Sequence, residues 1–133
     1  MYEILIVGGG PAGLTAAIYA ARAGKHVAVL ERGSTGGQII SAPLVENYPG
    51  IPSVSGTELA RQMTEQACTF GAEIVYTEAV GLEKTPAGFR VLCTDGVREA
   101  KAVILATGAA HRSLGLAAED ALTGCGVSYC CLL

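Results

Sequence analysis

The amino-acid sequence predicts an α/β fold in which a parallel β-sheet carries an inserted antiparallel meander. Residues 4–7 and 27–30 are short apolar runs without alternation, as is typical of parallel strands buried on both faces. Between them, residues 11–22 place apolar side chains at helical spacing on one face, and Gly24 follows as a stop signal. The beginning of the chain therefore predicts a strand-helix-strand unit.

A long loop and a second helix follow this unit. Residues 32–56 are rich in Gly, Pro, Ser and Asn, and a loop of this length in a compact domain usually has a function. Ser55 and Glu58 then have the spacing of a capping box, and apolar side chains recur at helical intervals up to Gly71. We therefore expect a second helix over residues 57–70.

The rest of the chain is dominated by strand patterns. Residues 73–76 predict another strand, and residues 102–106 predict the next parallel strand, which ends at Thr107 and Gly108. Between these two lie shorter strand-like runs with turn signals, which predict the antiparallel meander: residues 79–83, 89–94 and 98–101. No internal repeat interrupts the order.

Length and composition limit the class of protein. The 133 residues suit a single domain, but only 16% are charged, against about 25% in typical domains. Such a chain is either heavily buried or lacks a part that would cover it. The net charge of −3, with scattered basic residues, argues against a nucleic-acid partner. No apolar run approaches the roughly 18 residues of a membrane span, and the N-terminus lacks the basic region of a secretory signal, so we expect a cytoplasmic protein.

Cysteine usage argues against a metal site. The five cysteines are odd in number, are irregularly spaced and lack the paired pattern of a zinc site. In a reducing compartment, Cys68 and Cys93 are best interpreted as small buried apolar residues. The three others, Cys125, Cys130 and Cys131, cluster near the end of the chain.

The strongest local motif is a glycine-rich turn between the first strand and the first helix. Gly8, Gly10 and Gly13 satisfy G-x-G-x-x-G: the first permits a tight turn, the second lets the backbone approach a pyrophosphate, and the third allows close packing of helix on strand. Pro11 and Ala12 open the helix, whose free N–H groups point toward an anion. The motif in this context predicts a Rossmann-like dinucleotide site.

An acidic residue stands where that site requires one. Seventeen residues separate Gly13 from Glu31, which ends the second strand, where its carboxylate can accept hydrogen bonds from both ribose hydroxyls. The same charge would repel a 2′-phosphate, so the ADP part of FAD or NAD is favoured over NADP. The less favoured interpretation is a glycine-rich turn followed by a solvated glutamate.

Several further motifs resemble those of the low-molecular-weight thioredoxin reductases. They are Gly36-Gly37-Gln38, residues 46–50 (ENYPG), Ala106-Thr107-Gly108 and residues 126–130 (GVSYC), in the order and approximate spacing of that family. The resemblance implies that residues 1–133 form the N-terminal portion of a Rossmann-like FAD-binding domain that is incomplete at its C-terminus. The family's NADPH domain and the final segment of its FAD domain are absent from the chain.

The resemblance also implies which residues bind the cofactor. The glycine turn and Glu31 would hold the ADP moiety, and Asn47 would lie near the flavin. The other residues that it assigns to the FAD site are Gly36, Gly37, Gln38, Val80, Ala106, Thr107 and Gly108. In the parent reaction, NADPH passes a hydride to FAD, and electrons pass on to a CxxC disulfide and then to thioredoxin or a related disulfide protein.

The redox motif departs from the family pattern. Cys130 matches the first, catalytic cysteine of the CxxC, but its partner position is Leu133, and Cys131 follows Cys130 directly. A strained vicinal Cys130–Cys131 bridge and a Cys125–Cys130 bridge stay open as alternatives. The favoured interpretation is a free Cys130 thiol left by an incomplete motif.

These departures leave three interpretations of function. The leading one is a truncated or frameshifted thioredoxin-reductase-like flavoprotein, in which the strand at residues 102–106 has an uncovered edge and the isoalloxazine end of FAD is poorly enclosed. The second is a non-enzymatic dinucleotide-binding or dimerisation module, with a second copy of the chain as partner. The third is a flavoprotein reductase with a non-disulfide acceptor such as ferredoxin, which the retention of residues 126–130 disfavours.

Overall fold

A single mixed sheet organises the chain. The computed structural model describes residues 1–130, and its six strands lie in the order β3-β2-β1-β6-β5-β4. Parallel pairing joins β3, β2, β1 and β6, whereas β4, β5 and β6 pair antiparallel. The bounds of the strands are β1 Tyr2–Val7, β2 Val27–Glu31, β3 Glu73–Tyr76, β4 Ala79–Thr85, β5 Gly88–Cys93 and β6 Gly96–Leu105.

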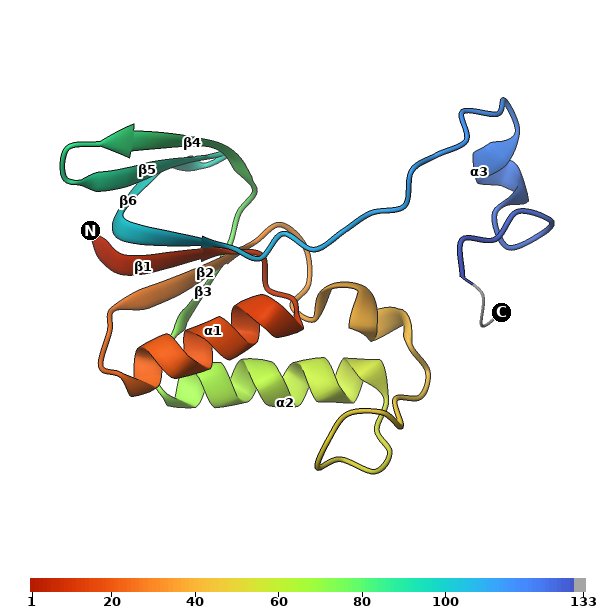
Figure 1. Ribbon diagram of the computed structural model, residues 1–133, viewed down its shortest axis with the longest axis horizontal. Coiled ribbons are helices and arrows are strands. Elements are labelled where there is room, and N and C mark those ends of the chain that lie inside the picture. The colour runs from red at the N-terminus through yellow and green to blue at the C-terminus, as the bar shows by residue number, and fades with distance from the viewer. Residues whose placement is uncertain (131–133) are drawn as a thin grey trace.

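Two helices cover one face of the parallel strands (Figure 1). Helix α1 (Pro11–Arg22) and helix α2 (Gly56–Thr69) lie side by side, and their small residues allow a close approach to the sheet. Ala17 of α1 and Ala67 of α2 are fully buried in one cluster with Ile6 and Val29. This cluster forms the core between the helices and the sheet.

The opposite face is covered by the antiparallel meander. Because successive side chains alternate along a strand, Leu5 points away from the face that carries Ile6. Leu5 and Leu30 are buried in a second cluster together with Val91 of β5. Strands β1 and β2 are therefore buried on both faces, which confirms the interpretation of their uninterrupted apolar runs, whereas Ile104 and Leu105 in the parallel part of β6 are exposed.

One expected boundary is wrong. The runs at 98–101 and 102–106 were expected to be separate strands, but the structure joins them in the single strand β6. Ala100 pairs with Phe89 of β5 on one side and with Tyr2 of β1 on the other, so one strand belongs to both the meander and the parallel sheet. Pairing with β5 ends at Ala100, and among the described residues the rest of β6 has a strand neighbour only in β1, as expected for an uncovered edge.

The two cysteines expected to be buried behave differently. Cys93 is buried, which confirms its prediction, whereas Cys68 is exposed. The buried face of α2 runs through Leu59, Met63 and Ala67, at intervals of four residues. Cys68 directly follows Ala67 and therefore turns away from this face.

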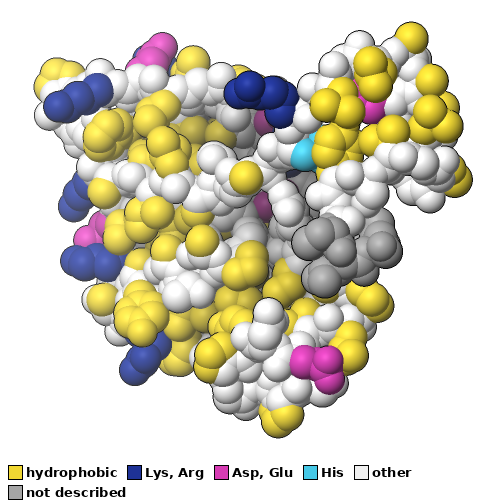
Figure 2. Space-filling view, turned by 45° about the vertical axis from the view of Figure 1, so that its right-hand side comes forward, with side chains coloured by type: hydrophobic (Ala, Val, Ile, Leu, Met, Phe, Trp, Pro, Cys, Tyr) yellow, Lys and Arg dark blue, Asp and Glu magenta, His cyan; other side chains and the backbone are white. Residues whose placement is uncertain are grey.

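After β6 the chain leaves the sheet as an arm over residues 109–130. It leads to the short helix α3 (Glu119–Leu122), apart from the sheet and its two large helices (Figure 1). The carboxylate of Glu119 accepts hydrogen bonds from the backbone of Leu114 and Leu116, and the rings of His111 and Tyr129 stack at 3.7 Å. Figure 2 shows apolar side chains gathered on the arm. Over the described residues, no helix has the length and apolar character needed to cross a membrane.

Candidate functional site

The candidate site is a cleft at the carboxyl ends of the parallel strands. Its volume is about 930 Å³, and its walls come from the segments that follow β1, β2, β3 and β6 and from the start of the 3₁₀ helix η1 (Gly37–Ser41). In parallel α/β sheets, ligands bind outside the carboxyl ends of the strands, where the loops diverge. The sheet order therefore places one continuous cleft over four strand ends.

The glycine turn after β1 forms the floor of this cleft. Gly8 has φ of +106°, and a Cβ placed there would lie 2.2 Å from the carbonyl oxygen of Ala106. A Cβ on Gly13 would lie 1.9 Å from the carbonyl oxygen of Gly8. Neither position can carry a side chain in this geometry, so both glycines are required by close backbone approach.

Gly10 differs from its two neighbours in the motif. Its φ is −74°, an ordinary value, and a Cβ on it would have no atom within 4 Å. Gly10 lines the cleft and is the N-cap of α1, with Pro11 as the first helical residue. The absent side chain thus leaves open space beside a helix N-terminus, whose N–H groups lack partners within the helix and favour an anion.

Glu31 is held at the edge of the same cleft. One carboxylate oxygen accepts a hydrogen bond from the Gly9 backbone N–H and the other from the Gly33 backbone N–H, both at 2.8 Å. A carboxylate oxygen has more than one lone pair, so each can accept a further hydrogen bond. The two backbone bonds fix the orientation of a negative charge beside the glycine turn.

Most of the residues assigned to the site by sequence line this cleft. They are Gly8, Gly10, Pro11, Ala12, Glu31, Gly37, Gln38, Ala106, Thr107 and Gly108. Gly13 lies beneath the turn, and Gly36 is buried against α2, where a Cβ would come within 2.5 Å of Ala60. These two glycines support the walls but do not line the cleft.

Asn47, Val80 and Cys130 do not line the cleft. Asn47 is exposed in the loop that precedes α2, and Cys130 is exposed at the end of the arm. Val80 is 63% exposed and lies at an irregularity in the pairing of β4 with β5, whereas its neighbour Ala79 lines the cleft. The structure therefore brings these three residues to no common site with the glycine turn.

Sequence reasoning missed the wall that follows β3. Thr77, Glu78 and Ala79 line the cleft, and the Arg32 guanidinium lies 3.7 Å from the Glu78 carboxylate. Gly33 completes the rim as the second backbone donor to Glu31. One indication of this wall was present in the sequence: a residue that directly follows a parallel strand lies at the carboxyl edge of the sheet.

Gln38 links two segments of the opposite wall of the cleft. Its side-chain amide donates to the backbone carbonyl oxygen of Ala109, so η1 is tied to the segment that follows β6. Both partners line the cleft. In this conformation one N–H of the Gln38 amide is engaged, which leaves its second N–H as a donor and its amide oxygen as an acceptor.

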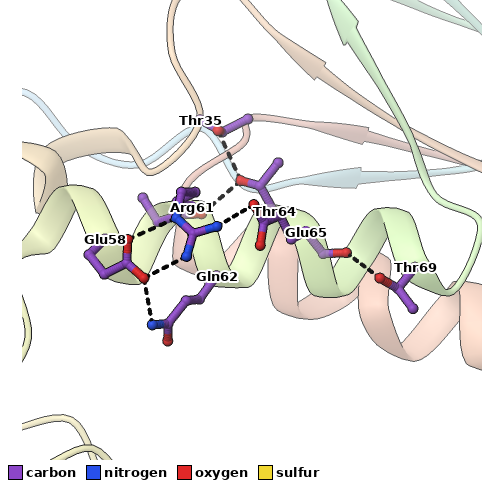
Figure 3. A network of polar contacts seen from close by, with 8 residues as sticks. Thr35, Glu58, Arg61, Gln62, Thr64, Glu65 and Thr69 are labelled. Atoms are coloured by element: carbon purple, nitrogen blue, oxygen red, sulfur yellow. Dashed lines mark hydrogen bonds and ion pairs between the residues drawn. The ribbon is translucent and has the colours of Figure 1, made fainter.

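A polar network on α2 supports the loop behind the site (Figure 3). The Arg61 guanidinium contacts the carboxylates of Glu58 and Glu65, and the hydrogen bonds that Arg61 donates lower the pKa of Glu58 to about 2. Thr64 donates a hydrogen bond to Thr35 at 2.9 Å, which ties α2 to the loop after β2. A smaller hollow of about 390 Å³ adjoins this network, but its only cation is already paired with two carboxylates.

The cysteines form no redox pair among the described residues. Cys125 and Cys130 are both free and exposed, so the Cys125–Cys130 bridge is not formed in this structure. Cys131 and Leu133, which bear on the vicinal bridge and on the missing CxxC partner, lie outside the described residues. Within residues 1–130, no group of three His, Cys, Asp or Glu side chains could hold a metal ion.

Comparison with known proteins adds independent evidence. The family model described as pyridine nucleotide-disulphide oxidoreductase matches residues 2–131. Thioredoxin reductase of Listeria monocytogenes is 43% identical over 130 residues, which cover 98% of this chain and 41% of that protein.

Solved structures agree with this match. Thioredoxin reductase of Lactococcus lactis (FR conformation) superposes with a TM-score of 0.89 at 39% identity, over 99% of this chain and 44% of that one. A ferredoxin-flavin thioredoxin reductase of Clostridium acetobutylicum has a TM-score of 0.75 at 32% identity, over 97% and 45% of the two chains.

These matches cover nearly all of this chain but less than half of each relative. This chain spans about two-fifths of the length of the curated relative, and the α/β fold with its inserted meander is the N-terminal part of that longer protein. The family expected from the sequence motifs is confirmed. The chain belongs to the pyridine nucleotide-disulphide oxidoreductase family, and it is similar to the N-terminal part of thioredoxin reductases.

Proposed function

We propose that the cleft binds the ADP half of FAD, with the pyrophosphate at the glycine turn and the ribose at Glu31. The observation that carries this proposal is the pairing of two features on adjacent strand ends. Gly10 leaves open space at the N-terminus of α1, and the Glu31 carboxylate is held in place by two backbone N–H groups. An anion suits the first position and a pair of hydroxyls suits the second.

FAD is supported over a mononucleotide by the extent of the cleft. Beyond the glycine turn the cleft continues past Ala106, Thr107 and Gly108 to Gln38, on the side away from Glu31. Its volume of about 930 Å³ lies near the upper end of the roughly 300–1,000 Å³ of small-molecule sites. Glycine and alanine lining lets a flat ring system approach the backbone, and Gln38 offers an amide oxygen to its polar edge.

When bound, FAD would supply the hydride and electron chemistry, and this chain would bind and orient it. Gly8, Gly13 and Gly36 would shape the walls. Asn47 and Val80 stay predictions, and their contribution would require a rearrangement of the loop before α2 or of the start of β4.

We assign the whole-protein activity on the strength of the relatives. As the N-terminal portion of an FAD domain, residues 1–133 would serve a cytoplasmic reductase that passes electrons from NADPH through FAD to a disulfide, with thioredoxin or a related protein as partner. Cys130, which is exposed, would be the first cysteine of the redox motif.

A binding titration tests the cofactor proposal. The chain is titrated with FAD by flavin fluorescence and with ADP, AMP and adenosine 2′,5′-bisphosphate by calorimetry; the last two differ only in the 2′-phosphate. We expect FAD and ADP to bind, and the 2′,5′-bisphosphate to bind much more weakly than AMP, because the Glu31 carboxylate repels the 2′-phosphate.

Two variants test whether the nucleotide binds at Glu31. In E31Q, loss of a charged acceptor should weaken ADP binding by about tenfold to a hundredfold, since hydrogen bonds to charged groups contribute about 1.5–3 kcal/mol. The matched control E83Q removes a carboxylate from the exposed surface of β4 and should bind ADP as the wild type does. Absence of any adenine-nucleotide binding, or equal affinity in E31Q, would overturn the proposal.

A further inference from the structure

The wall after β3 occupies a defined place along the cleft. The sheet order is β3-β2-β1-β6, so the segments that follow these strands meet a bound ligand in that order. With a pyrophosphate at the turn after β1 and a ribose at Glu31, the next part of the ligand in the direction of β3 is the adenine. Thr77, Glu78 and Ala79 form the wall at this position.

Thr77 anchors this wall from within. Thr77 as a whole is 6% exposed, and its hydroxyl donates a hydrogen bond to the Asp95 carboxylate at 2.5 Å. Its backbone N–H donates to the carbonyl oxygen of Glu31 at 2.9 Å. The residue that begins the wall is therefore bonded both to the residue proposed to hold the ribose and to the turn between β5 and β6.

Asp95 is itself fixed by a second side chain. The Arg98 guanidinium donates two hydrogen bonds to the two carboxylate oxygens of Asp95, at 2.7 and 2.8 Å. Such two-point pairs constrain orientation as well as distance. The neighbouring Thr94 backbone N–H donates to the carbonyl oxygen of Glu78 at 3.0 Å, so the same turn holds the wall at a second point.

We propose that Thr77, Asp95 and Arg98 form a positioning cluster that sets the adenine-binding wall of the cleft. None of the three is offered as a ligand; the cluster acts through the backbone of Glu78 and Ala79. This inference rests on the proposed binding of an ADP moiety. It assigns a binding role to the turn of the meander, which otherwise has only a structural one.

The effect of breaking the cluster follows from its geometry. Valine in place of the buried Thr77 keeps the shape but removes the hydroxyl, so the exposed Asp95 carboxylate loses one donor and the wall loses one anchor. The glycine turn and Glu31 keep their own backbone bonds. Affinity for the adenine should therefore fall, while affinity for the ribose and the diphosphate is retained.

The experiment compares ADP with UDP, which shares the ribose and the diphosphate but carries a smaller base. Calorimetry on the 133-residue chain gives both dissociation constants for the wild type, T77V, T77S and T69V. The T69V variant removes an exposed hydroxyl at the end of α2 that donates to the Glu65 carbonyl oxygen; Thr69 does not line the cleft, so this variant is the matched control. We expect T77V to bind ADP about tenfold more weakly and UDP within about twofold of the wild type, and T77S and T69V to match the wild type in both.

Each other result has a distinct meaning. Unchanged ADP affinity in T77V overturns the cluster's role, and so does an equal loss for ADP and UDP, which would indicate a general structural defect. Failure of T77S to restore ADP binding also overturns it, because serine keeps the hydroxyl. If the wild-type chain binds neither nucleotide, the proposed function fails, and this inference fails with it.

Discussion

Substitution of two glycines in the same turn should separate folding from binding. In G13A the new Cβ would lie 1.9 Å from the Gly8 carbonyl oxygen, whereas in G10A it would meet no atom within 4 Å. The first substitution places a carbon inside the contact of α1 with the turn. The second places it in the open space proposed for the pyrophosphate.

The size of the G13A effect follows from that distance. Contacts shorter than 3.0 Å are essentially never made by real Cβ atoms, so α1 would have to shift by about 1 Å against a buried core. Overpacking of this kind costs about 3 kcal/mol or more when backbone atoms are the obstacle. For a chain of this length, that corresponds to a decrease in Tm of about 10 °C.

Circular dichroism and ADP calorimetry on the same samples provide the assay. We expect G13A to unfold at a markedly lower temperature, and G10A to melt near the wild type but to bind ADP at least tenfold more weakly. A G13A variant with the wild-type Tm would refute the close approach of helix and turn. A folded G10A variant with full ADP affinity would refute the placement of the pyrophosphate.

Three further predictions concern other parts of the chain. S55A removes the side chain that caps α2 by accepting a backbone N–H at 3.2 Å, and should lower the free energy of unfolding by about 1 kcal/mol in urea titrations. The hydrogen bond from His26 lowers the pKa of Glu73, so the Glu73 carboxylate stabilises the fold above its unfolded pKa of about 4.3. The Tm of the wild type should therefore exceed that of E73Q at neutral pH, and this difference should disappear as the pH falls below about 4.3. A difference in Tm that stays constant down to pH 3 would contradict the prediction. Cys93 should react with a thiol reagent only on unfolding, so C93S should show one less unfolding-dependent thiol than the wild type.

Much of the fold could be predicted from local patterns. The uninterrupted apolar runs and the helical spacing marked β1, α1 and β2, because burial on both faces or on one stripe leaves a direct trace in the sequence. The continuity of β6 left no such trace. Ala100 is shared between β1 and β5, and pairing with two partners depends on tertiary structure alone.

The site residues that could be predicted from the sequence are those whose role depends on backbone geometry. Gly8 and Gly13 are required by close approach, and Glu31 is required by its place at a strand end, so motif spacing was sufficient. Thr77 carries no motif, because its role arises from a hydrogen bond to Asp95 across two strands. The choice between Val80 and its neighbour Ala79 depends on the irregular pairing at the start of β4, which spacing along the chain does not reveal.

The contact of Gly8 with Ala106 also has a consequence for folding order. The two residues are distant in sequence, yet the β1–β6 ladder, paired from Tyr2 with Ala100 onward, brings them together. Such non-local pairing must overcome a large loop-closure entropy and forms late. During synthesis the strand-helix-strand unit emerges first, so the cleft of a nascent chain would lack the wall that follows β6 until β6 leaves the ribosome and pairs with β1.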